Sequence, residues 1–134
     1  MIGIDTNVVL RVIVADEPKQ AETARNFIRN RCSSVDPGYV SHITLVELVW
    51  TLGKAYQLSR EDISRAVEQI LETAQLDVES SNDVAAALKD YRKGTADFAD
   101  CLLARVNTAA GCDYTITLDR KAARLTGFKL LSAR

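Results

Sequence analysis

Two aspartates of this sequence follow short apolar runs that are typical of buried strands. Asp5 comes directly after Ile2–Ile4, and Asp119 comes shortly after the β-branched run Tyr114–Thr117. In an open parallel sheet, ligands collect at the carboxyl ends of the strands, so both carboxylates are expected at one edge of a sheet. Each aspartate taken alone is explained equally well as a turn residue that bonds to nearby backbone N–H groups.

A third carboxylate, Glu47, lies in the most apolar helical stretch of the chain, Ile43–Leu52. An ionised side chain buried there without a partner would cost several kcal/mol, which indicates a specific role. The alternative is a narrow polar face, shared with Thr51 or Lys54, on which Glu47 simply meets water.

Asp97 and Asp100 stand three residues apart at the expected start of a helix, so their side chains share a face and meet the positive end of the helix dipole. An ordinary capping pair, with Asp97 as N-cap, has the same spacing. Capping does not explain a carboxylate beside a site that already holds Asp5 and Asp119.

Carboxylates gathered at one edge repel one another unless a cation balances them. The three cysteines are widely spaced and read as small buried hydrophobes, and His42 is the only histidine, so neither a zinc site nor a disulfide framework is expected. Oxygen donors alone select Mg²⁺ or Mn²⁺. The chemistry typical of such a cluster is metal-assisted attack of water on a phosphodiester. No glycine-rich nucleotide loop and no Ser/His/Asp pattern competes with this interpretation.

Strands alternating with helices must position these side chains, and this order predicts an α/β fold with a mostly parallel sheet in a single domain, residues 1–134. Helix starts are expected at the caps Asp16, Ser59 with Asp62, Ser80 with Asp83, and Asp97. The expected strands are Ile2–Ile4, Tyr39–Ser41, Leu76–Val78, Tyr114–Thr117 and Phe128–Leu131, and two further helices are expected over Val8–Ala15 and Thr44–Gln57.

The composition is that of a globular domain, with 134 residues of which 47% are apolar and 26% charged. No apolar stretch approaches the ~20 residues of a membrane span, and Asp5 interrupts the apolar N-terminus, so neither a membrane anchor nor a signal peptide is expected. A cytoplasmic protein is the consequence.

Four segments of the chain together resemble the PIN-domain family, and within it the VapC-type ribonuclease toxins of toxin-antitoxin pairs. The similarity runs over essentially the whole chain, and the order and spacing of the segments make it specific. The segments are Ile4–Val8 followed by Arg11 and Asp16, Ser41–Trp50, Asp97–Ala104, and Thr117–Ala123 followed by Gly127 and Phe128.

This resemblance implies a three-layer α/β/α fold with a central, mostly parallel sheet. It also implies a homodimer, an RNA substrate and a cognate VapB-type antitoxin with a segment over the acidic groove. The implied site is a catalytic metal quartet of Asp5, Glu47, Asp100 and Asp119, with Asp97 in a supporting or second-metal position and Asn7 and Thr117 supporting the site by hydrogen bonds. Glu47, expected to be partly buried, is the residue best suited to orient or deprotonate the attacking water.

Basic residues could bind the phosphates that flank the scissile bond, although each is also compatible with an ordinary solvated surface charge. Without the five carboxylates named above, the chain has 13 acidic and 17 basic residues, so the remainder of the chain is mildly basic. Trp50 is better explained by core or dimer packing than by base stacking. The phosphate-binding candidates are Arg11, Lys54, Arg92, Lys93, Arg120, Lys121 and Arg124.

The function predicted from these residues is that of a Mg²⁺- or Mn²⁺-dependent endoribonuclease, the toxin of a two-protein module. One alternative is a PIN-like module that binds RNA or a partner without cutting, and a complete acidic quartet speaks against it. Another is a Mg²⁺-binding phospho-acceptor domain. That class has adjacent acidic residues after its first strand and a lysine after its last, whereas here Thr6 and Asn7 follow Asp5, and Ser132 follows the final strand.

Overall fold

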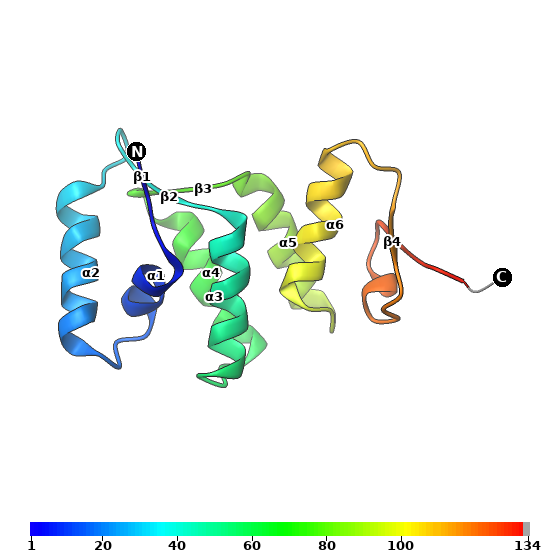
Figure 1. Ribbon diagram of the computed structural model, residues 1–134, viewed down its shortest axis with the longest axis horizontal. Helices are drawn as coiled ribbons and strands as arrows, with labels where there is room; N and C mark the ends of the chain where they lie inside the picture. Colours follow the sequence, from blue (N-terminus) through cyan, green and yellow to red (C-terminus); the bar gives the residue numbers. More distant parts are fainter. Residues whose placement is uncertain (133–134) are drawn as a thin grey trace. The chain divides into compact units, whose positions relative to one another are not determined.

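The computed structural model describes residues 1–132, which form two compact units divided after Ser81 (Figure 1). We call residues 1–81 the N-terminal unit and the described residues from 82 onward the C-terminal unit. Both units combine helices with strands that pair in parallel, which confirms the predicted α/β class. The prediction that residues 1–134 act as one domain stays a prediction.

The N-terminal unit contains a three-stranded parallel sheet in the order β1-β2-β3. In the central strand, Gly38 allows close approach, since a Cβ atom there would lie 2.8 Å from Ile4 Cγ1. The absence of a side chain at Gly38 lets β2 lie close to Ile4, the residue before Asp5. The elements of the unit are β1 (Ile2–Gly3), α1 (Thr6–Ile13), α2 (Pro18–Arg31), β2 (Gly38–Val40), α3 (His42–Lys54), α4 (Arg60–Glu72) and β3 (Leu76–Val78).

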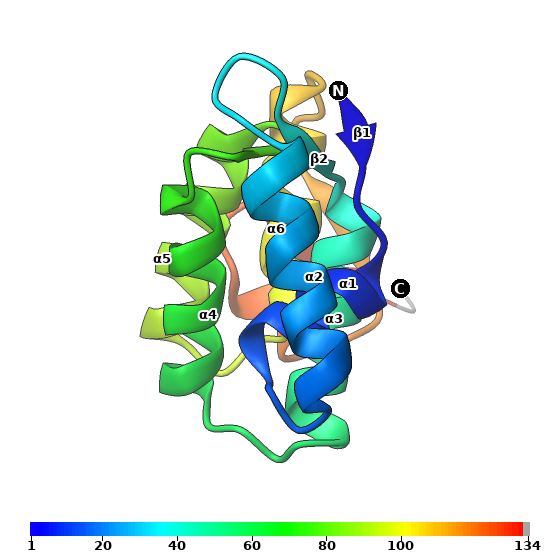
Figure 2. The ribbon, with the colours of Figure 1, turned by 90° about the vertical axis from the view of Figure 1, so that its left-hand side faces the viewer.

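Four helices complete the N-terminal unit, and α1 lies between α2 and α3 (Figures 1 and 2). Helix α3 also packs against α4, which in turn packs against β3. Leu45, Leu48 and Leu52, at helical spacing along α3, are fully buried. The apolar face of α3 therefore fixes the helix in the core, and Glu47 must emerge on another face.

The C-terminal unit contains α5 (Ser81–Lys93), α6 (Phe98–Ala109), β4 (Thr115–Thr117), the short 3₁₀ helix η1 (Ala122–Arg124) and β5 (Phe128–Leu130). Strands β4 and β5 form a two-stranded parallel sheet. An edge-to-face contact between Tyr91 and Phe98 and a two-bond ion pair from Arg105 to Asp90 join α5 to α6. The predicted single central sheet, which would include strands of both units, stays a prediction.

All five predicted strands are present with small changes of their bounds, and so is the Ser59 cap, whose hydroxyl accepts a hydrogen bond from the Asp62 backbone N–H. Two of the other predicted caps are wrong. Asp16 does not cap α2, because its carboxylate is bound by the side chains of Arg11 and Tyr56 and Glu17 occupies the N-cap position. Ser80 precedes α5 with a φ of +44°, outside the extended conformation of a typical N-cap.

Two aromatic side chains are more exposed than the sequence indicates. Trp50 on α3 is 65% exposed, so the prediction of core packing for it is wrong, while its packing in a dimer stays a prediction. The spacing of Ala24, Phe27 and Ile28 in α2 predicts that all three face the core, but Phe27 is 36% exposed while Ala24 and Ile28 are buried. No helix in residues 1–132 has the length and apolar character needed to cross a membrane.

Candidate active site

Asp5 lies two residues after the first strand and immediately before the first helix. It is the N-cap of α1, with extended backbone, and its Oδ1 accepts a hydrogen bond from the Thr6 backbone N–H at 2.7 Å. The sequence predicted that this helix begins at Val8, which is two residues too late. The capping bond at Asp5 allows α1 to begin at Thr6. The cap fixes the orientation of the exposed carboxylate, and within the described residues its Oδ2 accepts no hydrogen bond.

Glu47 lies next to this cap, on the neighbouring helix α3. The Thr6 hydroxyl donates a hydrogen bond to Glu47 Oε1 at 2.9 Å, so residues that are 41 positions apart in sequence meet at the end of β1. The Glu47 side chain is exposed, and the prediction that it is partly buried is therefore wrong. Its orientation comes from a specific hydrogen bond instead of from an apolar environment.

A serine cap orders the first turn of α3, and one threonine contact joins that turn to the residue that follows β1. Ser41 is the N-cap of α3 and accepts a hydrogen bond from the Thr44 backbone N–H at 3.3 Å. The buried Thr44 hydroxyl lies 3.5 Å from the carbonyl oxygen of Ile4, as the donor of a long hydrogen bond. Since Glu47 follows Thr44 by three residues, the two side chains share the face of α3 that meets β1 and α1.

A groove of about 800 Å³ adjoins Asp5 in the N-terminal unit. Its walls are the strand β1 and the helices α1 and α2, and Asn7 lines it in the first turn of α1. Most of the remaining lining is apolar, with Arg11 and Lys19 adding positive charge. The complete lining is Ile2, Gly3, Ile4, Asp5, Asn7, Val8, Arg11, Lys19, Gln20, Thr23, Ala24 and Phe27.

Arg11 is held in a hydrogen-bond network that joins α1 to α2 and to the residues after α3. Its guanidinium donates to Gln20 Oε1 at 2.7 Å, to Asp16 Oδ1 at 3.1 Å and to the Tyr56 hydroxyl at 3.3 Å. The Tyr56 hydroxyl in turn donates to Asp16 Oδ2 at 2.9 Å. Arg11 thus binds protein groups in this structure, and binding of a phosphate by Arg11 stays a prediction.

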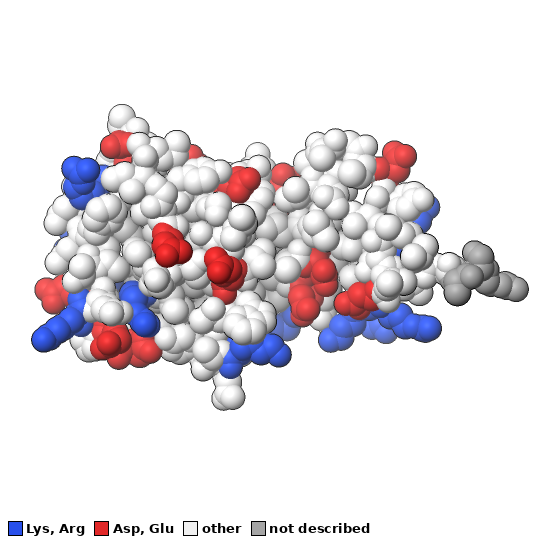
Figure 3. Space-filling view, viewed as in Figure 1, with Lys and Arg blue, Asp and Glu red and all other residues white. Residues whose placement is uncertain are grey.

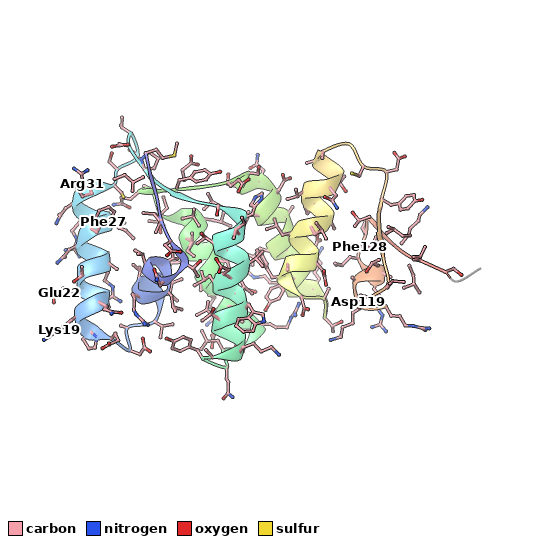
Figure 4. The ribbon with its side chains drawn as sticks, viewed as in Figure 1. Lys19, Glu22, Phe27, Arg31, Asp119 and Phe128 are labelled. Carbon is pink, nitrogen blue, oxygen red and sulfur yellow. The ribbon has the colours of Figure 1, made fainter. Side chains whose placement is uncertain are left out.

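In the C-terminal unit, Asp119 lies in a turn between β4 and η1 (Figure 4). Its Oδ1 accepts hydrogen bonds from the backbone N–H groups of Lys121 at 2.8 Å and Ala122 at 3.4 Å, while its own N–H donates to Thr117 Oγ1 at 3.0 Å. This is the turn aspartate that the sequence left open as an alternative. As at Asp5, the turn holds one carboxylate oxygen, and within residues 1–132 no hydrogen bond reaches the other.

Asp97 and Asp100 begin α6, as the sequence predicts, but they do not form a capping pair. Asp97 occupies the N-cap position, but its side chain accepts no capping hydrogen bond. Burial raises the pKa of the Asp100 carboxyl, and the negative charges of Asp97 and Asp119 raise it further. The structure therefore gathers three carboxylates of this unit closely enough for their charges to interact.

Packing within the C-terminal unit explains why Asp100 and Asp119 interact. Ala104, one turn after Asp100 on α6, forms a small buried cluster with Ala122 and Phe128. Ala122 in turn follows Asp119 by three residues. The Asn107 amide also donates to Thr115 Oγ1 at 2.9 Å, which ties α6 to β4.

The donor chemistry of these residues fits a hard divalent cation, because all five carboxylates offer oxygen. Among the softer donors, Cys112 is exposed, so the prediction that all three cysteines are buried is wrong. His42 binds Glu79 through its backbone N–H and its ring, as a hydrogen-bonded, half-buried side chain, and Cys32 and Cys101 are buried. No group of three or more His, Cys, Asp or Glu side chains within residues 1–132 is arranged to hold a metal ion. The metal quartet stays a prediction.

The other basic candidates, Arg11 apart, lie on the surface. Acidic side chains are visible over α1 and α3 in Figure 3, and basic ones gather beside η1. Lys129 was not among the basic residues predicted to bind phosphate. Its ammonium lies 4.3 Å from the centre of the Tyr114 ring. The exposed candidates are Lys54 at the end of α3, Arg92 and Lys93 at the end of α5, and Arg120, Lys121 and Arg124 around η1.

Comparison with known proteins identifies a family that the chain matches over most of its length. The sequence pattern of the PIN domain matches residues 2–127, which include all five carboxylates. The chain is also 30% identical over 129 residues to a VapC ribonuclease of Aquifex aeolicus (strain VF5), covering 96% of this chain and 94% of the relative. The chain therefore belongs to the PIN domain family.

Proposed function

We propose that this protein is a divalent-metal-dependent endoribonuclease, the toxin of a VapC-type toxin-antitoxin pair. Membership of the PIN family and similarity to a VapC ribonuclease support a nuclease. The observation that carries the proposal is the acidic cluster of Asp97, Asp100 and Asp119. Their mutual repulsion is unfavourable for the metal-free protein, and no Lys or Arg within the described residues forms an ion pair with any of the three.

In this proposal, Asp5, Asp100 and Asp119 bind the metal, and Glu47 binds it directly or through water. The expected ion is Mg²⁺ or Mn²⁺, which activates water and stabilises negative charge on the phosphoryl group. The capping bonds at Asp5 and Asp119 support these roles, since each orients a carboxylate while one of its oxygens accepts no hydrogen bond within residues 1–132. Asn7, Asp97 and Thr117 support the ligands.

Glu47 is the residue we assign to the attacking water. Its exposure gives water access to the carboxylate, and its hydrogen bond from Thr6 restricts the directions in which the second oxygen can point. We assign Lys54, Arg92, Lys93, Arg120, Lys121 and Arg124 to the phosphates that flank the scissile bond. Because no serine, cysteine or histidine is proposed as the nucleophile, water attacks the phosphorus directly.

We further propose that the protein works in the cytoplasm as a homodimer and that a VapB-type antitoxin covers the acidic site. The three cysteines form no disulfide in the described structure, and no described helix could span a membrane. The exposed Trp50 on α3 is a candidate for the dimer contact. The antitoxin would bind over the carboxylates and exclude RNA from them.

Cleavage of a single-stranded RNA by purified protein tests the proposal. With Mn²⁺, the wild type should cut, and Asp5→Asn should lose activity by several orders of magnitude because it removes a ligand charge. Asp77→Asn is the matched control, since Asp77 is an exposed carboxylate on β3 of the same unit. A wild type that binds the RNA without cutting it would instead support the binding module, and equal activity of Asp5→Asn and wild type would contradict the assigned site.

A further inference from the structure

We infer that Thr6 is a positioning residue that holds the Glu47 carboxylate beside Asp5 in the orientation that metal binding and cleavage require. The inference rests on the proposed function, because it concerns a site whose role for Glu47 is itself proposed. It goes beyond that function by assigning a role to a neutral hydroxyl that binds neither RNA nor metal in the proposal.

The Thr6 hydroxyl is available for this role because the helix start does not need it. A threonine in the first turn of a helix commonly bonds to nearby backbone, and an unsatisfied N–H there would attract its oxygen. Here Asp5 supplies the cap and accepts the Thr6 backbone N–H. The Thr6 hydroxyl instead donates to Glu47 Oε1 on α3 at 2.9 Å.

The chemical nature of the donor matters as much as its position. Other carboxylates of the N-terminal unit that are held in place, such as Asp16 and Glu61, pair with arginines. Glu47 accepts a hydrogen bond from a neutral group and has no ion pair within the described residues. A neutral donor orients the carboxylate and leaves its full negative charge for a cation, whereas an arginine would compete with that cation.

The surrounding contacts make the orientation specific. Thr44 connects the first turn of α3 to the backbone of Ile4, so the position of the helix beside β1 is already fixed. An exposed glutamate on a fixed helix still has several rotamers of similar energy. The bond from Thr6 selects the rotamers that keep Oε1 at the N-terminus of α1, next to the Asp5 cap.

Calorimetric titration with Mn²⁺ and RNA cleavage in three variants test the inference. Thr6→Val removes the hydroxyl at nearly constant shape, Thr6→Ser restores it, and Thr73→Val is the matched control. The control also removes one hydroxyl, which donates its hydrogen bond to the Gln69 backbone carbonyl within the N-terminal unit. Thermal melting of each metal-free variant measures any effect on folding.

Thr6→Val should bind Mn²⁺ and cleave RNA roughly 10-fold to 100-fold less well, the range found when a group supporting a metal ligand is lost. Thr6→Ser should recover most of both properties, and the metal-free melting temperature of Thr6→Val should shift no more than that of Thr73→Val. Wild-type affinity and rate in Thr6→Val, failure of Thr6→Ser to recover them, or an equal loss in Thr73→Val would overturn the inference.

Glu47→Gln separates this inference from the proposed function. If Glu47→Gln is inactive and Thr6→Val behaves as wild type, only the role of Thr6 is wrong. If Glu47→Gln cleaves RNA at the wild-type rate, the proposed role of Glu47 is wrong, and the role of Thr6 is wrong with it.

Discussion

Asp100 lies one helical turn after Asp97 at the start of α6, and the pKa of its carboxyl is raised by burial first and by the charge of Asp97 second. Asp119 adds a third, smaller contribution of the same sign. Because Asp97 makes no capping hydrogen bond with its side chain, helix stability does not account for the proximity of these charges. Their repulsion is a cost that binding of a cation would offset.

Asp100 should therefore contribute a loss of stability to the metal-free protein as the pH rises. The folded-state pKa of Asp100 lies above the unfolded value of 3.8, so the folded protein binds this proton more tightly than the unfolded chain does. The loss begins near pH 3.8, grows through the raised pKa and is complete above it. Urea unfolding of Asp100→Asn against wild type should show a more stable variant at neutral pH and no difference in strong acid. A less stable variant at neutral pH would contradict the repulsion.

Mn²⁺ should raise the melting temperature of the wild type. A ligand that binds only the folded state stabilises it by roughly 2.7 kcal/mol when its free concentration is 100 times its Kd. The variant Asp100→Asn should gain much less from the same addition, because it lacks one proposed ligand. Asp113→Asn, an exposed carboxylate of the same unit, is the control and should respond as the wild type does. Equal shifts in all three proteins would indicate that Mn²⁺ binds elsewhere.

Two helix starts allow a direct comparison of capping. Ser59 caps α4 through a hydrogen bond from the Asp62 N–H, and Ser59→Ala should cost about 1 kcal/mol. Asp97→Ala should cost less, because no capping bond is lost and the repulsion with Asp100 is relieved. Chemical unfolding of both variants without metal measures the difference. A larger loss in Asp97→Ala would show that Asp97 is principally a structural cap.

Gly38 and Gly53 should respond in opposite directions to alanine. At Gly38, a Cβ atom would lie 2.8 Å from Ile4 Cγ1, and the forced displacement should cost roughly 1–3 kcal/mol. At Gly53 in α3, an added Cβ atom would lie 3.7 Å from Ile63 Cδ1, which is an ordinary contact distance. Gly53→Ala should therefore raise the free energy of unfolding by roughly 0.5–1 kcal/mol. Unfolding free energies in urea test both values. A stable Gly38→Ala would show that β1 and β2 tolerate a wider separation.

Local features of the fold were predictable from the sequence. The strands leading to Asp5 and Asp119, the Ser59 cap and the start of α6 at Asp97 depend on residues close together in the chain, where propensity and capping dominate. The predicted cap at Asp16 failed for the opposite reason. Its carboxylate is bound by the hydroxyl of Tyr56, which is 40 residues away, and no local pattern reveals that contact.

The candidate site shows the same limit. The acidic residues could be named from their types and spacing, but the bond from Thr6 to Glu47 links two helices across 41 positions and was not foreseen. The predicted burial of Glu47 was wrong because it was inferred from apolar neighbours in sequence. In the helix, Leu45 and Leu48 face the core, while Glu47 lies on an exposed part of the surface beside the start of α1.

Analysis of the product ends tests the central claim most directly, because it shows which oxygen attacks the phosphorus. With end-labelled single-stranded RNA and Mn²⁺, attack by water predicts products that carry 5′-phosphate and 3′-hydroxyl ends, and it predicts no cleavage in EDTA. Cleavage that persists in EDTA, or products that carry a 2′,3′-cyclic phosphate, would identify the 2′-hydroxyl as the nucleophile and contradict the metal-dependent mechanism proposed for these carboxylates.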